Sequence, residues 1–363
     1  MKNASSMAML EIFAINFALN NTLSLSEKYG LVRNVGSLTK LYEKVLQGAY
    51  PRLYQLLSTG EGEKIYERTC KFGARVWVWG DDLYPDKLID LTRPPFVLYV
   101  AGADIPSQSC LLSVIGTRRP TNYGIRVTRQ LVAALVQNQV GIMSGLARGI
   151  DTFAHSTTIE NHGYTIVVLA HGLDCIYPRE NQRLKQSILA QGGTLCSEYA
   201  LGVRPRQHHF RDRNRINAAL SDGILVVEAD QKSGTKITVH EGLLLNKEIY
   251  SIPGPIDSSM SGFPNQLIAD GAKVVQSAKD IVEDFKSDFI LSASKACIEH
   301  ISDPLDRDLL RYFDVDEAKS IDGFFEHTNH CLPEIIERVS QFEIDEVLKQ
   351  GIDGRYVLTK RYE

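Results

Sequence analysis

The stretch VIGTRRPTNYGIRVTRQLVAALV, residues 114–136, decides the fold class. It begins with an apolar run, continues through a loop from Thr117 to Gly124, and ends in a segment whose apolar residues recur at helical spacing. A strand, a short glycine-bearing loop and a helix, in that order, form the repeating unit of α/β proteins. We therefore expect an α/β fold around this stretch.

The same order recurs between about residues 110 and 285. Apolar runs begin at positions 140, 164, 193, 223 and 248, and they read VGIMSG, YTIVVLAHG, GTLCSEY, GILVVEAD and EIYSIPG. Continuous apolar runs separated by helical segments are typical of strands that are buried on both faces of a parallel sheet. The sequence predicts a doubly wound, mostly parallel sheet.

The flanking segments have a different pattern. Residues 1–75 contain short helical patterns separated by Gly and Pro, which predicts a small helical domain. Residues 76–285 form the expected main domain, and two strands are expected near its start. Residues 300–363 contain three short helical patterns and a final apolar run, which predicts a winged-helix-like domain.

Composition excludes several classes of protein. The 363 residues are 44% hydrophobic and carry a formal net charge of -4, so the chain is not a protein that coats nucleic acid with its whole surface. The six cysteines lack C-x-x-C spacing, which favours reduced thiols and no structural metal. No apolar run reaches 18 residues, and Glu11 and Asn16 interrupt the apolar N-terminal segment. We expect a cytoplasmic protein without a membrane span.

Two loops that follow strands carry glycines and arginines. Ligands of open parallel sheets gather at the carboxyl ends of the strands. The first loop contains Arg118 and Arg119 beside the start of a helix, whose free N–H groups favour an anion. The second loop, SGLARGID, contains Gly145 and Arg148. Each loop alone is also compatible with ordinary turn glycines and solvated arginines, but two on one sheet edge favour a shared phosphate-bearing ligand.

The stretch RPRQHHFRDRNR, residues 204–215, concentrates cations around one aromatic ring. We expect it to form a loop before a helix that begins near Asn214. Single-stranded nucleic acid needs cations for its phosphates and a flat π surface for its bases, and Phe210 among arginines offers both. In the alternative, Phe210 and Arg215 pack inward and pair with carboxylates such as Glu198.

Two further loops complete this edge of the sheet. AHGLDCIYPRENQRL contains His171 and Tyr177. A histidine after a strand is more often structural than catalytic, and Tyr-Pro is ordinary turn chemistry, so a structural role is favoured over a functional one for both. EADQKSGTKITVHE places Lys232 at another turn between a strand and a helix, a plausible seat for a phosphate. Neither the dinucleotide fingerprint, the P-loop pattern nor any common hydrolase motif is present. We predict no enzyme activity and no cofactor.

The motifs GTRRPTNYG, SGLARGIDTFAH, VLAHGLDCIYPREN, HFRDRNRI and YSIPGPI, in this order, resemble the DNA-processing protein A (DprA/Smf) family over about residues 75–275. The resemblance implies an extended Rossmann-like fold that binds single-stranded DNA, forms homodimers and loads the recombinase RecA onto DNA during natural transformation. It also implies an N-terminal sterile-alpha-motif-like or helix-hairpin-helix domain and a C-terminal winged helix. Carried over by motif, the contacts are Gly116, Thr117, Arg118, Arg206, Phe210, Lys232, Ser233 and Gly234. With the candidates from the loops, the predicted DNA-binding residues are Gly116, Thr117, Arg118, Arg119, Gly145, Arg148, Arg206, Phe210, Arg213, Arg215, Lys232, Ser233, Gly234 and Thr235.

Two other functions remain open at this stage. A Rossmann-like phosphoribohydrolase of nucleoside monophosphates would carry P-G-G-x-G-T-x-x-E, whereas the nearest match here, KSGTKITVHE, lacks the paired glycines and has Thr238 at the position of the glutamate. A regulator that reads duplex DNA through the C-terminal region would need cations there. The segment LPEIIERVSQFEIDEVLKQG is instead acidic.

Overall fold

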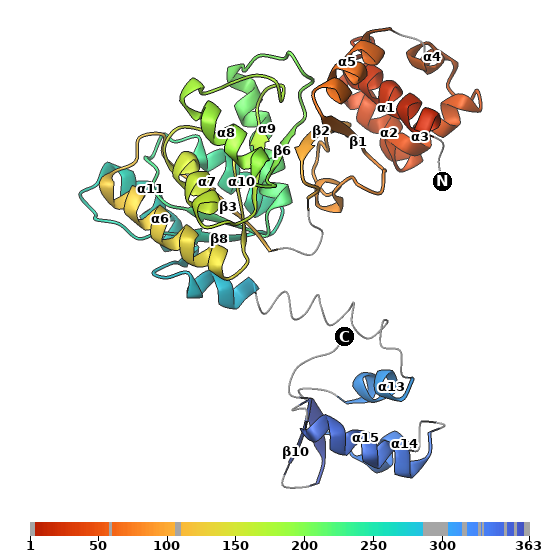
Figure 1. Cartoon of the computed structure of the whole chain (residues 1–363), viewed down its shortest axis with the longest axis vertical. Coiled ribbons are helices and arrows are strands. Elements are labelled where there is room, and N and C mark those ends of the chain that lie inside the picture. The colour runs from red at the N-terminus through yellow and green to blue at the C-terminus, as the bar shows by residue number, and fades with distance from the viewer. Residues whose placement is uncertain are drawn as a thin grey trace. The chain divides into compact units, whose positions relative to one another are not determined.

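The computed structural model of the chain describes residues 4–57, 60–105, 110–285, 304–313, 318–325, 328, 330–344, 347–351 and 354–358 (Figure 1). The chain divides into two compact units, Met1–Ile281 and Val282–Glu363. Among the described residues, the helices are too short or too polar to span a bilayer.

The N-terminal part of the first unit is helical, and its helices are α1 (Ala4–Leu19), α2 (Leu25–Val35), α3 (Leu38–Leu46), α4 (Pro51–Tyr54) and α5 (Gly60–Lys71). Ser24 and Glu27 form a capping box that fixes the start of α2, and Ser37 caps α3. The buried side chains of these helices belong to the same apolar cluster as those of the first two strands. A separate domain ending at residue 75 stays a prediction.

A nine-stranded sheet forms the centre of the first unit. Its strands are β1 (Ala74–Val78), β2 (Val97–Gly102), β3 (Leu111–Ile115), β4 (Gly141–Ser144), β5 (Thr165–Leu169), β6 (Thr194–Ser197), β7 (Gly223–Val226), β8 (Glu248–Ser251) and β9 (Lys273–Val274). The order is β1-β2-β6-β5-β4-β3-β7-β8-β9. Every neighbouring pair in the part of this order from β6 to β9 is parallel. Strand β2 runs antiparallel to β6, and β1 runs antiparallel to β2. The predicted doubly wound, mostly parallel fold is confirmed.

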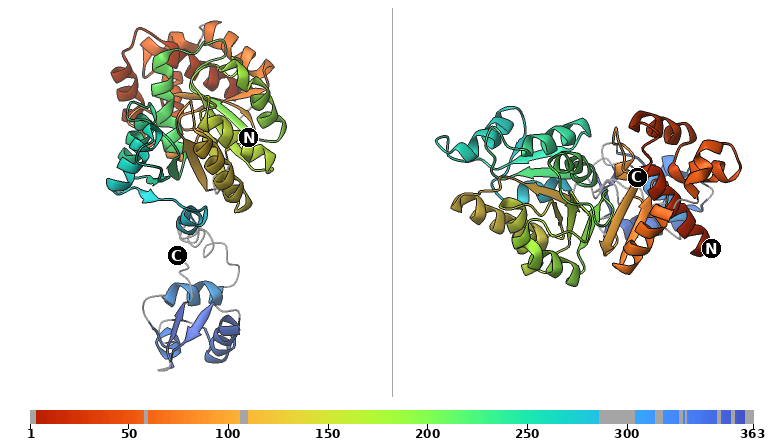
Figure 2. Two further views of the ribbon diagram at one scale, coloured as in Figure 1. Left: turned by 90° about the vertical axis from the view of Figure 1, so that its left-hand side faces the viewer. Right: turned by 90° about the horizontal axis from the view of Figure 1, so that it is seen from above.

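Helices cover both faces of this sheet, as the right-hand view of Figure 2 shows. They are α6 (Asn122–Gln137), α7 (Ile150–Glu160), α8 (Gln182–Ala190), α9 (Gln207–Leu220), α10 (Thr235–Leu244) and α11 (Gly262–Ala269). The chain adds β4, β5 and β6 on one side of β3 and then returns to place β7 on the other side. The order of the strands therefore reverses between β3 and β7, which is where ligands of such sheets bind.

The second unit contains α13 (Pro304–Tyr312), α14 (Ile321–Phe325), α15 (Leu332–Ile344), β10 (Leu348–Gln350) and β11 (Tyr356–Leu358). The two strands form an antiparallel hairpin, and Lys319 bridges to Tyr356. Its own apolar core includes Leu309, Phe313 and Ile335. The sequence predicts three helices and one final strand, and the structure adds the second strand. Assignment as a winged helix stays a prediction.

Candidate functional site

A cleft of about 970 Å³ opens where the strand order reverses. Loops that follow β3, β4, β5, β6 and β7 all contribute to its walls. The cleft brings together most of the predicted site residues, namely Gly116, Thr117, Arg118, Arg119, Gly145, Arg206, Phe210, Arg213, Ser233, Gly234 and Thr235. These positions are scattered over 120 residues of sequence, and the parallel sheet aligns them at one edge.

Glu228 holds the first loop in place from beneath. Its side chain is buried, and the carboxylate accepts from the hydroxyl of Thr121 at 2.5 Å and from the Thr121 N–H at 2.9 Å. The carbonyl of Glu228 accepts from the N–H of Thr117 at 2.6 Å. Since these bonds fix both ends of the loop, the side chains of Arg118 and Arg119 are left exposed at the cleft.

Asp151 organises the second loop. It lies in the first turn of α7, and its carboxylate accepts from the N–H groups of Gly145 and Ala147 at 3.1 and 3.2 Å. Burial raises the pKa of Asp151, and the charge of Arg213 and these hydrogen bonds act in the opposite direction. Gly149 has a φ of 78° and lies against the backbone of Thr117, where no β-carbon would fit. The second loop is thus closed tightly onto the first.

The stretch 204–215 is mainly helical, which corrects the expected loop. Helix α9 begins at Gln207 rather than near Asn214, because no residue after Pro205 in this stretch opposes helix formation. One face of α9 lines the cleft at spacings of three and four residues, and it comprises Gln207, Phe210, Arg211, Arg213, Asn214 and Asn217.

An aromatic and cationic cluster lies in the cleft. Phe210 is partly exposed, and the guanidinium carbon of Arg118 lies 5.5 Å from the centroid of its ring. The ring of Tyr177 lies 5.5 Å from that of Phe210 at an interplanar angle of 58°. The inward-facing alternative for Phe210 is therefore not what the structure shows.

Arg213 forms the floor of the cleft. Its side chain is buried and donates from Nη1 to the carbonyl of Val168 at 2.6 Å. Burial lowers the pKa of Arg213, while the Asp151 carboxylate acts to raise it. Arg213 therefore supplies positive charge from below, whereas Arg118 and Arg211 supply it from exposed positions.

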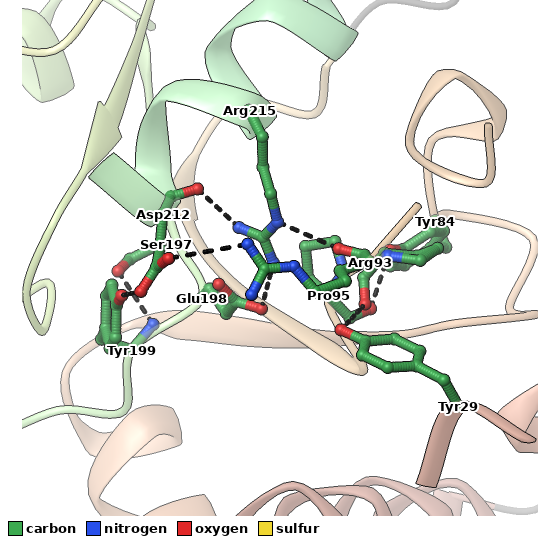
Figure 3. A network of polar contacts seen from close by, with 10 residues as sticks. Tyr29, Tyr84, Arg93, Pro95, Ser197, Glu198, Tyr199, Asp212 and Arg215 are labelled. Atoms are coloured by element: carbon green, nitrogen blue, oxygen red, sulfur yellow. Dashed lines mark hydrogen bonds and ion pairs between the residues drawn. The ribbon is translucent and has the colours of Figure 1, made fainter. Parts of the chain in front are cut away.

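Arg215 points away from the cleft, which is a correction to the predicted set. It is buried in the network shown in Figure 3, where Nη2 donates to Glu198 at 2.6 Å and Nε donates to the carbonyl of Arg93 at 3.0 Å. Burial acts to lower the pKa of Arg215, but Glu198 outweighs it and the pKa is raised. The alternative considered for Arg215, an inward ion pair with Glu198, is the one the structure shows.

Two other predicted residues also lie outside the cleft lining. Arg148 is exposed and forms an ion pair with Glu180. Lys232 is exposed in the turn after β7, while its neighbours Ser233, Gly234 and Thr235 line the cleft. Both residues lie in turns, where consecutive side chains point in different directions. Residues that are adjacent in the sequence therefore need not line the same surface.

The profile of the family described as DNA recombination-mediator protein A matches residues 75–286. The chain belongs to this family. Protein Smf of Escherichia coli is 35% identical over 287 residues, which cover 77% of this chain and 76% of that protein. The DNA processing protein DprA of Bacillus subtilis is 39% identical over 202 residues, which cover 55% and 68% of the two chains. The resemblance to the DprA/Smf family is confirmed.

Solved structures of the DprA/Smf family have the same fold. DprA from Streptococcus pneumoniae superposes with a TM-score of 0.60 at 28% identity and covers 77% of this chain and 96% of its own. DprA from Helicobacter pylori gives a TM-score of 0.54 at 29% identity, with 59% and 96% covered, and its structure concerns that protein's binding of single-stranded DNA.

The cleft lining of this DprA/Smf-family chain also includes residues outside the predicted set, among them Tyr177, Arg211 and Asn214. The sequence predicts ordinary turn chemistry for Tyr177. Arg211 is one of the arginines beside Phe210 that the sequence offers as cations, but the predicted set includes neither Arg211 nor Asn214. A helical wheel started at Gln207 would have placed Phe210, Arg211 and Asn214 on one face. Nothing local to Tyr177 indicates that its ring lies beside Phe210.

Proposed function

We propose that the chain binds single-stranded DNA in the cleft without cutting it. The observation that carries this proposal is the ring of Phe210 between Arg118 and Tyr177 inside a cleft lined by arginines. Unstacked bases bind to exposed aromatic faces and guanidinium planes, and phosphates bind to the cations around them. The Helicobacter pylori relative, whose structure concerns single-stranded DNA, supports the same ligand here.

The cations of the cleft are available for phosphates. Arg118, Arg119, Arg206 and Arg211 are exposed, and within the described ranges none of them lies within 4 Å of a carboxylate oxygen. A chain with a net charge of -4 thus concentrates unneutralised positive charge at one sheet edge. Three or four phosphate contacts on a single strand predict a slope of roughly -2 to -3 in a plot of log affinity against log salt.

We also propose that the protein acts as a homodimer and loads RecA onto the bound strand during natural transformation or recombination. Membership of a family described as recombination mediators supports this role. Leu243 and Leu244 at the end of α10 are 56% and 66% exposed, and such apolar surface is typical of contacts between subunits. Analytical ultracentrifugation of the full chain tests the dimer.

Competition gel shifts with single-stranded and duplex oligonucleotides, with and without RecA, test the function. We expect preference for the single strand and faster assembly of RecA filaments on it. Equal binding of both forms, or none, would contradict the proposal. If the protein instead reads duplex DNA, it should prefer the duplex oligonucleotide to the single strand.

Hydrolysis of nucleoside monophosphates is tested separately. Thr238 lines the cleft where a phosphoribohydrolase of the related type would carry its glutamate, so the group that performs that reaction is missing at this position. Incubation with the four nucleoside monophosphates, followed by chromatography, is expected to release no free base.

A further inference from the structure

Helix α6 leads out of the cleft and carries a row of exposed side chains. Arg119 lines the cleft, and α6 begins three residues later at Asn122. Asn122, Arg126 and Arg129 follow at spacings of four and three residues, so they lie on one face of the helix. At 1.5 Å per residue, Arg129 lies about 10 Å along the axis from the start of α6.

This face is cationic. The sequence of α6, NYGIRVTRQLVAALVQ, contains two arginines and no carboxylate. Arg126 and Arg129 are both exposed, and within the described parts of the chain neither forms an ion pair. On neighbouring α7, Asp151 is buried beneath the cleft loops, and Glu160 is the last residue of the helix. Positive charge on this face is therefore not balanced by the two helices that form it.

Both arginines lie over aromatic rings. The guanidinium carbon of Arg126 is 5.7 Å from the ring of Tyr123, and that of Arg129 is 5.3 Å from the ring of Phe153 on α7. The hydroxyl of Tyr123 donates to the carbonyl of Pro253 at 2.7 Å, which fixes the ring. Guanidinium planes held over rings offer flat surfaces on which unstacked bases stack.

The row is continuous with the cleft. The N–H of Ile150, the first residue of α7, donates to the carbonyl of Thr117 at 3.2 Å, so α7 starts directly against the first cleft loop. Helices α6 and α7 pack side by side over the sheet (Figure 1). Helix α6 follows the first cleft loop and helix α7 starts against that loop, so both helices contribute to this surface.

We propose that this surface, formed by Arg119, Tyr123, Arg126, Arg129 and Phe153, binds the continuation of the single strand as it leaves the cleft. The proposal rests on the proposed function, since the strand must first occupy the cleft. Its occupant is a polynucleotide because the surface combines unneutralised cations with guanidinium planes held over aromatic rings, and because it joins a cleft of the same character. The cleft holds the first few nucleotides, and α6 holds those that follow.

Oligodeoxythymidines of two lengths separate the two surfaces. One of about 4 nucleotides fills the cleft alone, and one of about 16 nucleotides reaches along α6. In the full chain, Arg126→Gln with Arg129→Gln is expected to weaken the longer strand about tenfold and to reduce its salt slope by about 1.4, which corresponds to two lost phosphate contacts. Binding of the short strand should change less than about twofold, since its contacts lie in the cleft. The matched control is Lys44→Gln with Arg52→Gln, which removes two exposed charges from the N-terminal helices and should alter neither.

Replacement by lysine provides a second test. Arg126→Lys with Arg129→Lys keeps both charges, so the salt slope of the longer strand should return to the wild-type value. The proposal is overturned if the Gln double variant binds the longer strand like the wild type, or if it weakens both strands equally. If the wild type binds neither strand, the proposed function itself is overturned. If the wild type binds both strands and only Phe210→Ala weakens that binding, the cleft site stands and the path along α6 is rejected.

Discussion

The guanidinium of Arg213 lies directly against Gly145. A β-carbon at Gly145 would stand 1.6 Å from Nη1 of Arg213 and 2.1 Å from its central carbon. Gly145→Ala must therefore displace a buried side chain that donates to the carbonyl of Val168. We expect a loss of about 1–3 kcal/mol in the free energy of unfolding, measured in urea, together with weaker DNA binding because the floor of the cleft moves.

Gly234 is the matched control for that substitution. It also lines the cleft, but a β-carbon there meets nothing within 4 Å, and its φ of -63° suits any residue. Gly234→Ala should leave the free energy of unfolding within about 0.5 kcal/mol of the wild type. Equal changes in the free energy of unfolding for the two substitutions would show that the contact between Gly145 and Arg213 does not determine stability.

The ring of Phe210 is expected to supply the stacking energy. Phe210→Ala should cost about 1–3 kcal/mol of binding free energy for a single strand, and the salt slope should not change, because no phosphate contact is lost. Fluorescence titration at several salt concentrations measures both quantities. Phe72→Ala removes a ring that is 41% exposed in the N-terminal part and should bind normally. A Phe210 variant that binds like the wild type would remove the central support of the site.

Arg118 and Arg148 are expected to behave differently, although both are exposed arginines of neighbouring loops. Arg118→Ala should weaken all sequences alike and reduce the salt slope by about 0.7, the value for one phosphate contact on a single strand. Arg148 is already neutralised by Glu180, so Arg148→Ala should change the slope little. The same titrations decide this, and identical slopes for the two variants would contradict the assignment.

The sheet and the cleft were predictable because both follow from local patterns. Apolar runs separated by helices determine a parallel sheet, and a parallel sheet places all of its post-strand loops at one edge. Knowing only that Gly116, Gly145 and Thr235 follow strands was therefore enough to place them together. No pairing between distant residues had to be known.

Side-chain direction was not predictable in the same way. Arg211, Arg213 and Arg215 alternate in the sequence, yet the first is exposed, the second forms the floor of the cleft and the third is buried against Glu198. This outcome depends on where α9 begins and on a partner from another segment, the carbonyl of Arg93. Tyr177 likewise reaches Phe210 only through tertiary packing.

The ion pair of Arg215 and Glu198 should be asymmetric in energy. The side chain of Arg215 is 8% exposed and that of Glu198 is 23% exposed. Glu198→Gln leaves a buried guanidinium without its counter-charge and should cost about 3 kcal/mol of unfolding free energy, whereas Arg215→Met leaves a carboxylate that water reaches and should cost less. The double variant should be more stable than Glu198→Gln alone. Additive losses in urea unfolding would show that the two groups are not coupled.

Buried histidines should make the protein less stable in acid. Burial lowers the pKa of His155 to about 3 and also lowers the pKa of His171 and of His209. At these three histidines the unfolded chain binds more protons than the folded one below pH 6.5, so their contribution to stability falls as pH falls from about 6.5. For His155 alone the slope approaches about 1.4 kcal/mol per pH unit. Urea unfolding of the wild type and of His155→Gln between pH 7 and pH 5 measures the loss, because both proteins share the opposing titration of Glu11. Parallel profiles would contradict burial of the His155 ring.

Glu11 should oppose this acid effect over part of the range. Its side chain is 7% exposed, and burial raises its pKa from 4.5 to about 7, against the effect of a hydrogen bond from Tyr66. Between pH 4.5 and 7 the folded state therefore keeps a proton that the unfolded state has lost, and stability from this group declines as pH rises. Glu11→Gln removes that decline, so from pH 4.5 to 6.5 the stability of the variant should rise more steeply than that of the wild type, by up to about 1.4 kcal/mol per pH unit. Since all other titrating groups are shared, the difference between the two urea profiles isolates Glu11, and parallel profiles would show that its carboxyl titrates alike in the folded and unfolded states.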